Sequence, residues 1–166
     1  MQNYAFKLWA IMSAAGFATS FISAKQLIAD KAPFASVLTW VGMAIALSGL
    51  LGIVYVIILL VPSYDREGDE FTTSGIYRLV RHPLYLSGMV LNLGILVAVW
   101  SVHGWASIQL YPLDAVGIIF YFLAARSEDG YNIAKFGEPY KRYAARVPGL
   151  NFTSRLFQSW IGRSKP

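Results

Sequence analysis

Long apolar stretches separated by short polar segments dominate this chain. Lys, Arg, Asp and Glu are absent from residues 8–24, 32–64 and 82–113, and Asp114 alone interrupts the apolar stretch that ends at Ala125. A helix of about 20 apolar residues matches the thickness of a bilayer. The pattern therefore predicts an all-α integral membrane protein with about four transmembrane helices.

The four predicted spans are residues 8–24, 36–61, 84–102 and 105–125. The first is short, and the small residues Ala18-Thr19-Ser20 would also allow it to be a cleaved signal peptide. We expect a retained helix. Only His103-Gly104 separates the last two spans, which predicts a tight helical hairpin with Trp100 and Trp105 at its tip.

The second span carries a stripe of small residues at helical spacing. Gly42, Ala46 and Gly49 follow one another at i, i+4 and i+7. Such a face lets two helix backbones approach closely in a membrane, so we expect it to pack against another span.

Four spans place the N-terminus, the 62–83 segment and the C-terminal tail on one side of the membrane. That side holds twelve of the fourteen Lys and Arg residues, and only Lys25 and Lys31 lie opposite. The positive-inside rule assigns it to the cytoplasm. The protein is thus predicted to be multi-pass, with both termini cytoplasmic.

Composition supports the same assignment. Of the 166 residues, 56% are hydrophobic and 14% charged, and cysteine is absent, which removes disulfides, thiolate metal sites and cysteine nucleophiles. The net charge of +5 comes from residues between and after apolar spans, a pattern of lipid contact rather than nucleic-acid binding. We predict a single membrane domain over 1–166, comprising two N-terminal spans (1–62), a motif-bearing hairpin (63–148) and an amphipathic tail (149–166).

Polar residues cluster in two segments that flank the hairpin. The first, 69–85, precedes the third span, where Pro83 suits the first helical turn, and the second, 126–129, follows the fourth span. Because hairpin arms of similar length return to the same face, we expect one cytoplasmic pocket. Alternatively, the arginines are orientation signals, the acidic residues are their surface partners and the tyrosines are interfacial aromatics.

Both segments carry longer motifs. Residues 73–85 read TSGIYRLVRHPLY and resemble the TxGxYxxxRHPxY signature of the isoprenylcysteine carboxyl methyltransferase and phospholipid methyltransferase superfamily. Residues 128–143 read EDGYNIAKFGEPYKRY and resemble its second signature, EExxLxxxFGxxYxxY, followed by Val147-Pro148. The resemblance covers about residues 69–148.

The resemblance implies an integral-membrane enzyme that uses S-adenosylmethionine to methylate a lipophilic acceptor, with no metal. Carried over by position, it implies that the cofactor-binding residues are Thr72, Tyr77, His82, Pro83, Leu84, Tyr85, Glu128 and Asp129. The candidate catalytic residues are Arg81, His82 and Glu128, and the candidate substrate-binding residues are Arg126 and Asp114. Aromatic faces and carboxylates suit a cationic sulfonium.

The chain departs from the family pattern at several positions. Asp129 replaces the second Glu, Asn132 replaces a leucine, and Asp69 stands where prenylcysteine enzymes tend to have histidine. Ala124 occupies the place of a substrate-binding arginine, and Arg126, its nearest substitute, would face elsewhere on a continuing helix. The resemblance is therefore stronger for the residues that bind the cofactor than for those that bind the substrate.

Asp114 is also a candidate structural residue. Asp114 lies eleven residues after His103, and Asn92 lies eleven residues before His103. This spacing predicts that Asn92 and Asp114 lie at the same depth in the membrane and face each other, directly or through one water. His103 is too far from His82 to share a haem iron with it.

Several alternatives stay open from the sequence. The acceptor can be a prenylcysteine carboxylate, a phospholipid amine or a small apolar thiol or acid. An NADPH-dependent reductase related to sterol reductases and a non-catalytic membrane scaffold are the rival functions, and the oligomeric state is undetermined. In the last 40 residues, aromatic side chains alternate with basic ones, and we expect them to lie against the membrane. They include Tyr131, Phe136, Tyr140 and Tyr143.

Overall fold

The computed structural model describes residues 36–64, 71–104 and 110–150, together with Lys7, Ile11, Ala18 and Lys25 as single residues. This part of the chain is helical and contains no strand, so the predicted all-α class is confirmed for it. The elements are α2 (Val37–Tyr64), the 3-10 helix η1 (Gly75–Arg78), α3 (Pro83–His103), α4 (Leu110–Phe136) and α5 (Glu138–Arg146). Apart from those single residues, the predicted first span lies outside the described residues, as does the tail from 151 onward.

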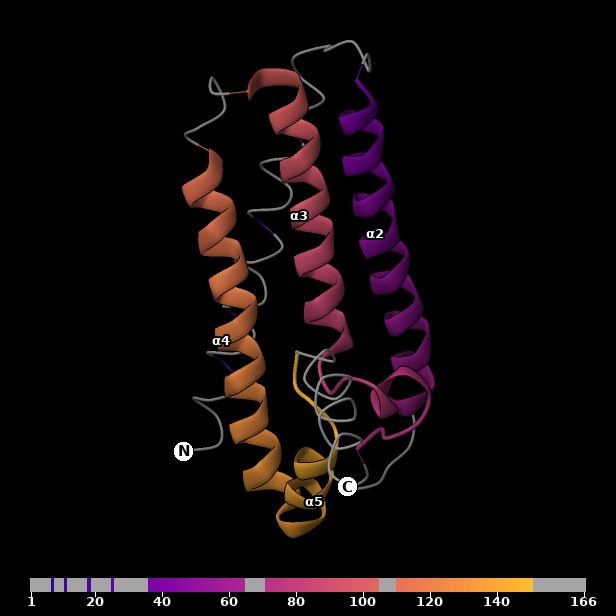
Figure 1. Cartoon of the computed structure of the whole chain (residues 1–166). Helices are drawn as coiled ribbons and strands as arrows, with labels where there is room; N and C mark the ends of the chain where they lie inside the picture. Colours follow the sequence, from indigo (N-terminus) through magenta and orange to yellow (C-terminus); the bar gives the residue numbers. More distant parts are fainter. Residues whose placement is uncertain are drawn as a thin grey trace, which may run out of the picture.

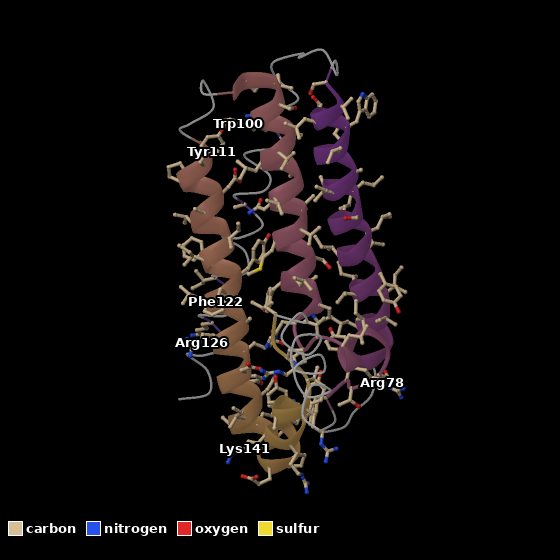
Figure 2. The ribbon with its side chains drawn as sticks, in the orientation of Figure 1. Arg78, Trp100, Tyr111, Phe122, Arg126 and Lys141 are labelled. Atoms are coloured by element: carbon tan, nitrogen blue, oxygen red, sulfur yellow. The ribbon has the colours of Figure 1, made fainter. Side chains whose placement is uncertain are left out.

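Three long helices lie side by side, with α3 between α2 and α4 (Figure 1). The short helix α5 follows α4 at the same end of the bundle as η1 and the start of α3 (Figure 1). Arg78, Arg126 and Lys141 lie toward this end, whereas Trp100 and Tyr111 lie toward the other (Figure 2). The hairpin therefore returns the two motif segments to one end of the molecule, as predicted.

The small-residue stripe of α2 packs directly on α3. A Cβ added at Gly42 would lie 2.5 Å from the backbone nitrogen of Ala98, and one at Gly94 would overlap the backbone of Ala46. Only glycine allows such an approach, because any side chain would meet backbone atoms that cannot move aside. The predicted role of the stripe in helix contact is confirmed, and close backbone packing replaces the hydrophobic driving force that lipid does not provide.

A hydrogen bond between side chains joins the same two helices at the opposite end from the motifs. Thr39 Oγ1 lies 2.7 Å from Ser101 Oγ, and Ser36 Oγ lies 2.8 Å from Thr39 Oγ1. Thr39 is almost completely buried. These bonds satisfy polar groups that are withdrawn from water and hold the register of the two helices.

Two described helices are long and apolar enough to cross a membrane, namely Val37–Leu60 within α2 and Pro83–His103, which is α3. The outer face of α2 presents Leu47, Leu51 and Ile58, whose exposed fractions are 55%, 58% and 62%. A continuous apolar face of this kind suits lipid better than water. The helices thus indicate a membrane protein.

Helix α4 differs from the prediction at its C-terminal end. At its N-terminal end the described part begins at Leu110, and the predicted start of this span, residues 105–109, lies outside the described residues. At the other end α4 does not stop at Ala125 but continues to Phe136. The acidic motif residues therefore stand on the last turns of a long helix rather than after it.

Two contacts between α3 and α4 are defined. The rings of Trp100 and Tyr111 are 5.5 Å apart, and a Cβ on Gly88 would lie 2.7 Å from Tyr121 Cζ. Neither contact includes Asn92 or Asp114, so the predicted match of these two residues in depth stays a prediction.

Asn92 and Asp114 are nevertheless both buried, with exposed fractions of 0% and 1%. Neither polar atom of the Asn92 amide has a hydrogen-bond partner among the described residues, so it makes no direct bond to Asp114.

The buried amide of Asn92 gives a stability prediction. Replacing Asn92 with Leu removes two polar atoms that have no hydrogen-bond partner among the described residues, at similar volume, so we expect unfolding in detergent to become less favourable by about 1 kcal/mol or more. The melting temperature, followed by circular dichroism, should rise by a few degrees. A lower melting temperature would show that the amide has a partner, such as one water shared with Asp114.

Candidate active site

The first motif forms the turn that leads into α3. Residues 75–78 make η1, and His82 is the N-cap residue of α3, with Pro83 in the first helical turn. Proline suits that position because its missing N–H would have no partner inside the helix. The predicted helix start is confirmed. The His82 ring does not cap the helix, which leaves it able to contact other elements.

The end of the second motif runs alongside this turn. The backbone N–H of Arg81 donates to the carbonyl of Pro148 at 2.9 Å, and that of His82 donates to the carbonyl of Gly149 at 3.3 Å. The chain arrives there through a sharp bend at Gly137, whose φ of 63° is in the left-handed region that glycine tolerates. Backbone pairing thus fixes the charged residues of the first motif against those of the second.

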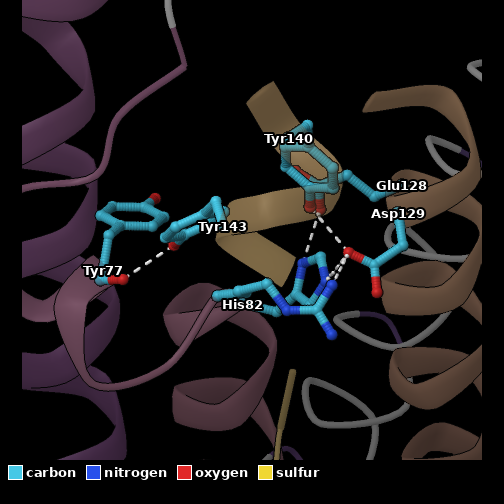
Figure 3. Close-up of polar contacts among 7 residues, drawn as sticks. Tyr77, His82, Glu128, Asp129, Tyr140 and Tyr143 are labelled. Atoms are coloured by element: carbon cyan, nitrogen blue, oxygen red, sulfur yellow. Dashed lines mark hydrogen bonds and ion pairs between the residues drawn. The ribbon is translucent and has the colours of Figure 1, made fainter. Parts of the chain in front are cut away.

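Four charged side chains meet at this junction, and we call Arg81, His82, Glu128 and Asp129 the charge cluster (Figure 3). His82 Nδ1 lies 3.2 Å from Glu128 Oε2, and His82 Nε2 lies 3.0 Å from Asp129 Oδ1. Arg81 Nη1 donates to the same Asp129 oxygen at 2.7 Å. The two segments are 46 to 48 residues apart in sequence and form one site.

His82 is held in its charged form. Burial disfavours the imidazolium, but the hydrogen bonds to Asp129 and Glu128 and their negative charges outweigh this and raise the pKa of His82 from 6.5 to about 9. Both ring nitrogens then donate to carboxylates. A histidine in this state cannot accept a proton at neutral pH, so its geometry suits positioning of the carboxylates rather than general-base chemistry.

Asp129 is the centre of the cluster. Burial favours its neutral form, but the hydrogen bond from His82, the one from Tyr140 and the charge of Arg81 together lower its pKa below the usual value. The Tyr140 hydroxyl donates to Asp129 Oδ1 at 2.7 Å. Three donors thus converge on one carboxylate oxygen, which holds Asp129 ionised and its side chain in place.

Aromatic rings surround the charge cluster. Tyr85 is buried, and its ring centroid is 5.8 Å from that of His82 and 6.4 Å from that of Tyr121. On the α5 side, the ring of Phe71 lies 5.1 Å from Tyr140 and 5.3 Å from Tyr143. These contacts exclude water from one side of the ion pairs and thereby strengthen them.

The structure brings most of the predicted cofactor residues to one place. Tyr77 lies on η1, where its carbonyl accepts a hydrogen bond of 2.7 Å from the Tyr143 hydroxyl (Figure 3). Thr72 is half-buried in the segment that leads to η1. Pro83 and Leu84 form the first turn of α3, directly after His82.

The two predicted substrate-binding residues lie elsewhere. Arg126 is exposed, and its guanidinium lies over the ring of Phe122, 5.8 Å from the centroid, away from the cluster (Figure 2). Asp114 is fourteen residues before Glu128 on the same helix, which places it about 21 Å away. Ala124, the position of the family arginine, is buried in the core beside Tyr85.

Tyr140 has a role in the site that the sequence did not predict. It was expected to lie against the membrane with the other tail aromatics, yet it is 3% exposed and bonded to Asp129, so that expectation was wrong for this residue. The signal was present, because Tyr140 is one of the two spaced tyrosines of the second motif.

The charge state of His82 predicts a pH dependence. Its pKa is higher in the folded protein than its ordinary value of 6.5, so the stability it contributes is complete below about pH 6.5 and is lost as pH rises through about 9. A shift of this size corresponds to roughly 3 kcal/mol. Melting temperatures should therefore fall between pH 6.5 and 9.5. The His82→Gln variant should show a flatter profile over that range, and an equal slope in both proteins would contradict the assignment.

Comparisons with known proteins agree with the motifs. The chain is 36% identical over 94 residues, 56% of its length, to methanethiol S-methyltransferase 2 from Bradyrhizobium diazoefficiens. It is 32% identical over 101 residues, 57% of its length, to protein-S-isoprenylcysteine O-methyltransferase B from Arabidopsis thaliana. Both relatives confirm the resemblance to this methyltransferase superfamily.

The matched regions cover 32% of the Bradyrhizobium protein and 46% of the Arabidopsis protein, so this chain spans less than half the length of either relative. No family model matches the chain, and no solved structure gives a significant match.

Proposed function

We propose that the protein is an S-adenosylmethionine-dependent methyltransferase of the membrane that acts on a lipophilic acceptor. The observation that carries this proposal is the charge cluster, in which the RHP turn and the acidic pair of the two methyltransferase motifs meet within hydrogen-bond distance. The relatives support the reaction class, since both are named methyltransferases.

The residues of the site fit the donor. Bound S-adenosylmethionine would supply a methyl group activated by a positively charged sulfur, and its other end carries an ammonium and a carboxylate. Tyr77, which is half-buried, offers an aromatic ring, and Glu128 offers a carboxylate whose side chain is 32% exposed. The buried Nε of Arg81 has no partner among the described residues, as expected where a polar ligand completes the site.

The protonation states of the cluster favour an acceptor that is already ionised. His82 holds protons on both nitrogens, and Asp129 is a poor base because its pKa is lowered. A carboxylate acceptor needs no deprotonation before attack, so its methylation requires positioning rather than proton transfer. We therefore propose an isoprenylcysteine-type carboxylate as the acceptor. A small apolar thiol is the second candidate, because the Bradyrhizobium relative is named for one.

A transfer assay tests this function. Detergent-purified protein is mixed with methyl-labelled S-adenosylmethionine and either N-acetyl-S-farnesylcysteine or a small alkanethiol. We expect a base-labile methyl ester on the farnesylcysteine. Glu128→Ala should remove transfer, whereas Glu138→Ala, at an exposed residue of α5, should not. Labelling of the thiol alone would overturn the proposed acceptor, and labelling of neither would overturn the proposed function.

We further propose that four helices span the membrane with both termini in the cytoplasm, which places the charge cluster at the cytoplasmic face. The support is the distribution of basic residues and the return of α4 to the end that carries Arg78 and Lys141 (Figure 2).

Labelling of introduced cysteines checks this topology, since the chain has none of its own. A cysteine at Ser74 should react with an impermeant maleimide only from the cytoplasmic side, and one at Ser101 only from the other side. If both positions react from the same side, α3 does not cross the membrane.

A further inference from the structure

An arginine and a leucine are exposed together on the turn that precedes α3. Arg78 is the last residue of η1 and is exposed, and the side chain that follows it, Leu79, is 65% exposed. The backbone is fixed on both sides of this pair. The N–H of Leu79 donates to the carbonyl of Ile76 at 2.9 Å, and that of Arg81 donates to the carbonyl of Pro148 at 2.9 Å. The turn therefore holds a large apolar side chain on the surface.

The start of η1 packs against the end of α2, which sets the depth of this pair. A Cβ added at Gly75 would lie 3.6 Å from Leu59 Cδ1 and 3.9 Å from the Tyr55 hydroxyl oxygen. Both side chains belong to the apolar stretch Val37–Leu60, which is long enough to cross a membrane. Arg78 follows Gly75 by three residues, or about 6 Å at the rise of a 3-10 helix. The pair thus lies beside the end of the surface of α2 that suits lipid.

Arg78 has no counter-ion in the part of the chain that the structure describes. Its guanidinium lies at the outer side of the end of α2, on the opposite side of the bundle from Arg126 (Figure 2). Glu138 is the only exposed acidic residue among the described ones, and it pairs with Lys141 on α5 at 2.6 Å. A basic residue at the boundary of an apolar span is attracted to an anionic lipid surface.

We propose that Arg78 and Leu79 form a binding site for an anionic phospholipid at the end of α2. The planar guanidinium of Arg78 binds the lipid phosphate through two parallel hydrogen bonds, and Leu79 contacts the acyl chains. The lipid is anionic because in a zwitterionic one the ammonium of the headgroup already balances the phosphate. The inference rests on α2 crossing a membrane and not on the methyl-transfer reaction.

A second source of negative charge has to be distinguished from lipid. The segment 65–70 lies outside the described residues, and its sequence contains four acidic residues. An ion pair between this segment and Arg78 would make lipid binding insensitive to the charge of the headgroup. The discriminating quantity is therefore the preference of the protein for one headgroup over another when the acyl chains are the same.

Native mass spectrometry of the detergent-purified protein measures this preference. The protein is titrated with dioleoylphosphatidylglycerol or dioleoylphosphatidylcholine, and the fraction of protein with one bound lipid gives the affinity. We expect the unaltered protein to prefer phosphatidylglycerol. Arg78→Gln should weaken that lipid about fivefold, the effect of one basic residue near an anionic surface, and leave phosphatidylcholine within about twofold. Leu79→Gln should weaken both lipids by a similar factor and retain the preference, because it removes apolar contact and keeps the charge.

Two controls make the result specific. Lys141→Gln removes one positive charge from α5, beside Glu138 rather than beside α2, and should leave both affinities unchanged. Inorganic phosphate carries the charge without the acyl chains and should not displace phosphatidylglycerol at equal concentration. Equal affinity of the unaltered protein for the two lipids, or an equal loss in Arg78→Gln and Lys141→Gln, would overturn the inference. Displacement by inorganic phosphate would overturn it too, because the site would then be one for a free anion.

Discussion

Gly94→Val should destabilise the protein more than any other single substitution considered for this bundle. A side chain at Gly94 meets the backbone of Ala46 and, at 2.7 Å, the carbonyl oxygen of Gly42, and neither can rotate away. The two helices must then separate, which breaks the 2.7 Å hydrogen bond between Thr39 and Ser101. We expect a loss of about 3 kcal/mol or more in the free energy of unfolding.

The measurement is the melting temperature in detergent, with Gly130→Ala as the matched control. Gly130 lies in α4, and a Cβ there meets nothing within 4 Å, so its replacement should stabilise the helix slightly, by up to about 1 kcal/mol. A Gly94→Val protein that melts at the unaltered temperature would show that α2 and α3 do not pack through these backbones.

The second large effect is expected for Asp129→Asn. This change keeps the size of the side chain but removes the charge that faces Arg81 Nη1 and His82 Nε2, and it leaves an amide where three donors converge. Breaking one side of a largely buried ion pair costs about 3 kcal/mol. Because the side chain of Asp129 is 23% exposed, solvent relieves part of this cost.

The same variant should weaken the pH dependence attributed to His82, since the largest favourable contribution to its raised pKa comes from Asp129, and only the contribution of Glu128 remains. Melting profiles at pH 6.5 and 9.5 would measure both effects. Glu138→Gln is the control, because Glu138 forms an exposed pair with Lys141 and its loss should not be measurable. Equal melting temperatures for Asp129→Asn and Glu138→Gln would show that the charge cluster does not stabilise the fold.

The helices were predictable where local rules act alone. Proline in the first turn marks the start of α3, and a stripe of small residues marks the face of α2 that packs on another helix. Both features depend only on local sequence, and both predictions are confirmed. The end of α4 was not predictable in this way. Arg126 and the following acidic residues looked like the polar boundary of a span, but they are acceptable helix formers, so the helix continues past the membrane-like region to the glycine at 137.

The site was predictable as a meeting of two segments and less so in its internal arrangement. Motif order and the hairpin bring His82 and Glu128 to one end, whereas the double contact of His82 with both carboxylates depends on the pitch of α4. Arg126 faces outward because, two residues before Glu128, it lies about 200° away around the helix.

Direct calorimetry on the detergent-purified chain tests the central claim, which is that the charge cluster belongs to a site for a methyl donor. S-adenosylhomocysteine and NADPH are titrated separately into the same preparation. We expect saturable binding of S-adenosylhomocysteine at one site per chain and no binding of NADPH. Binding of NADPH without S-adenosylhomocysteine would identify a reductase-like site, and binding of neither to the folded protein would leave a scaffold that retains the motifs without their ligand.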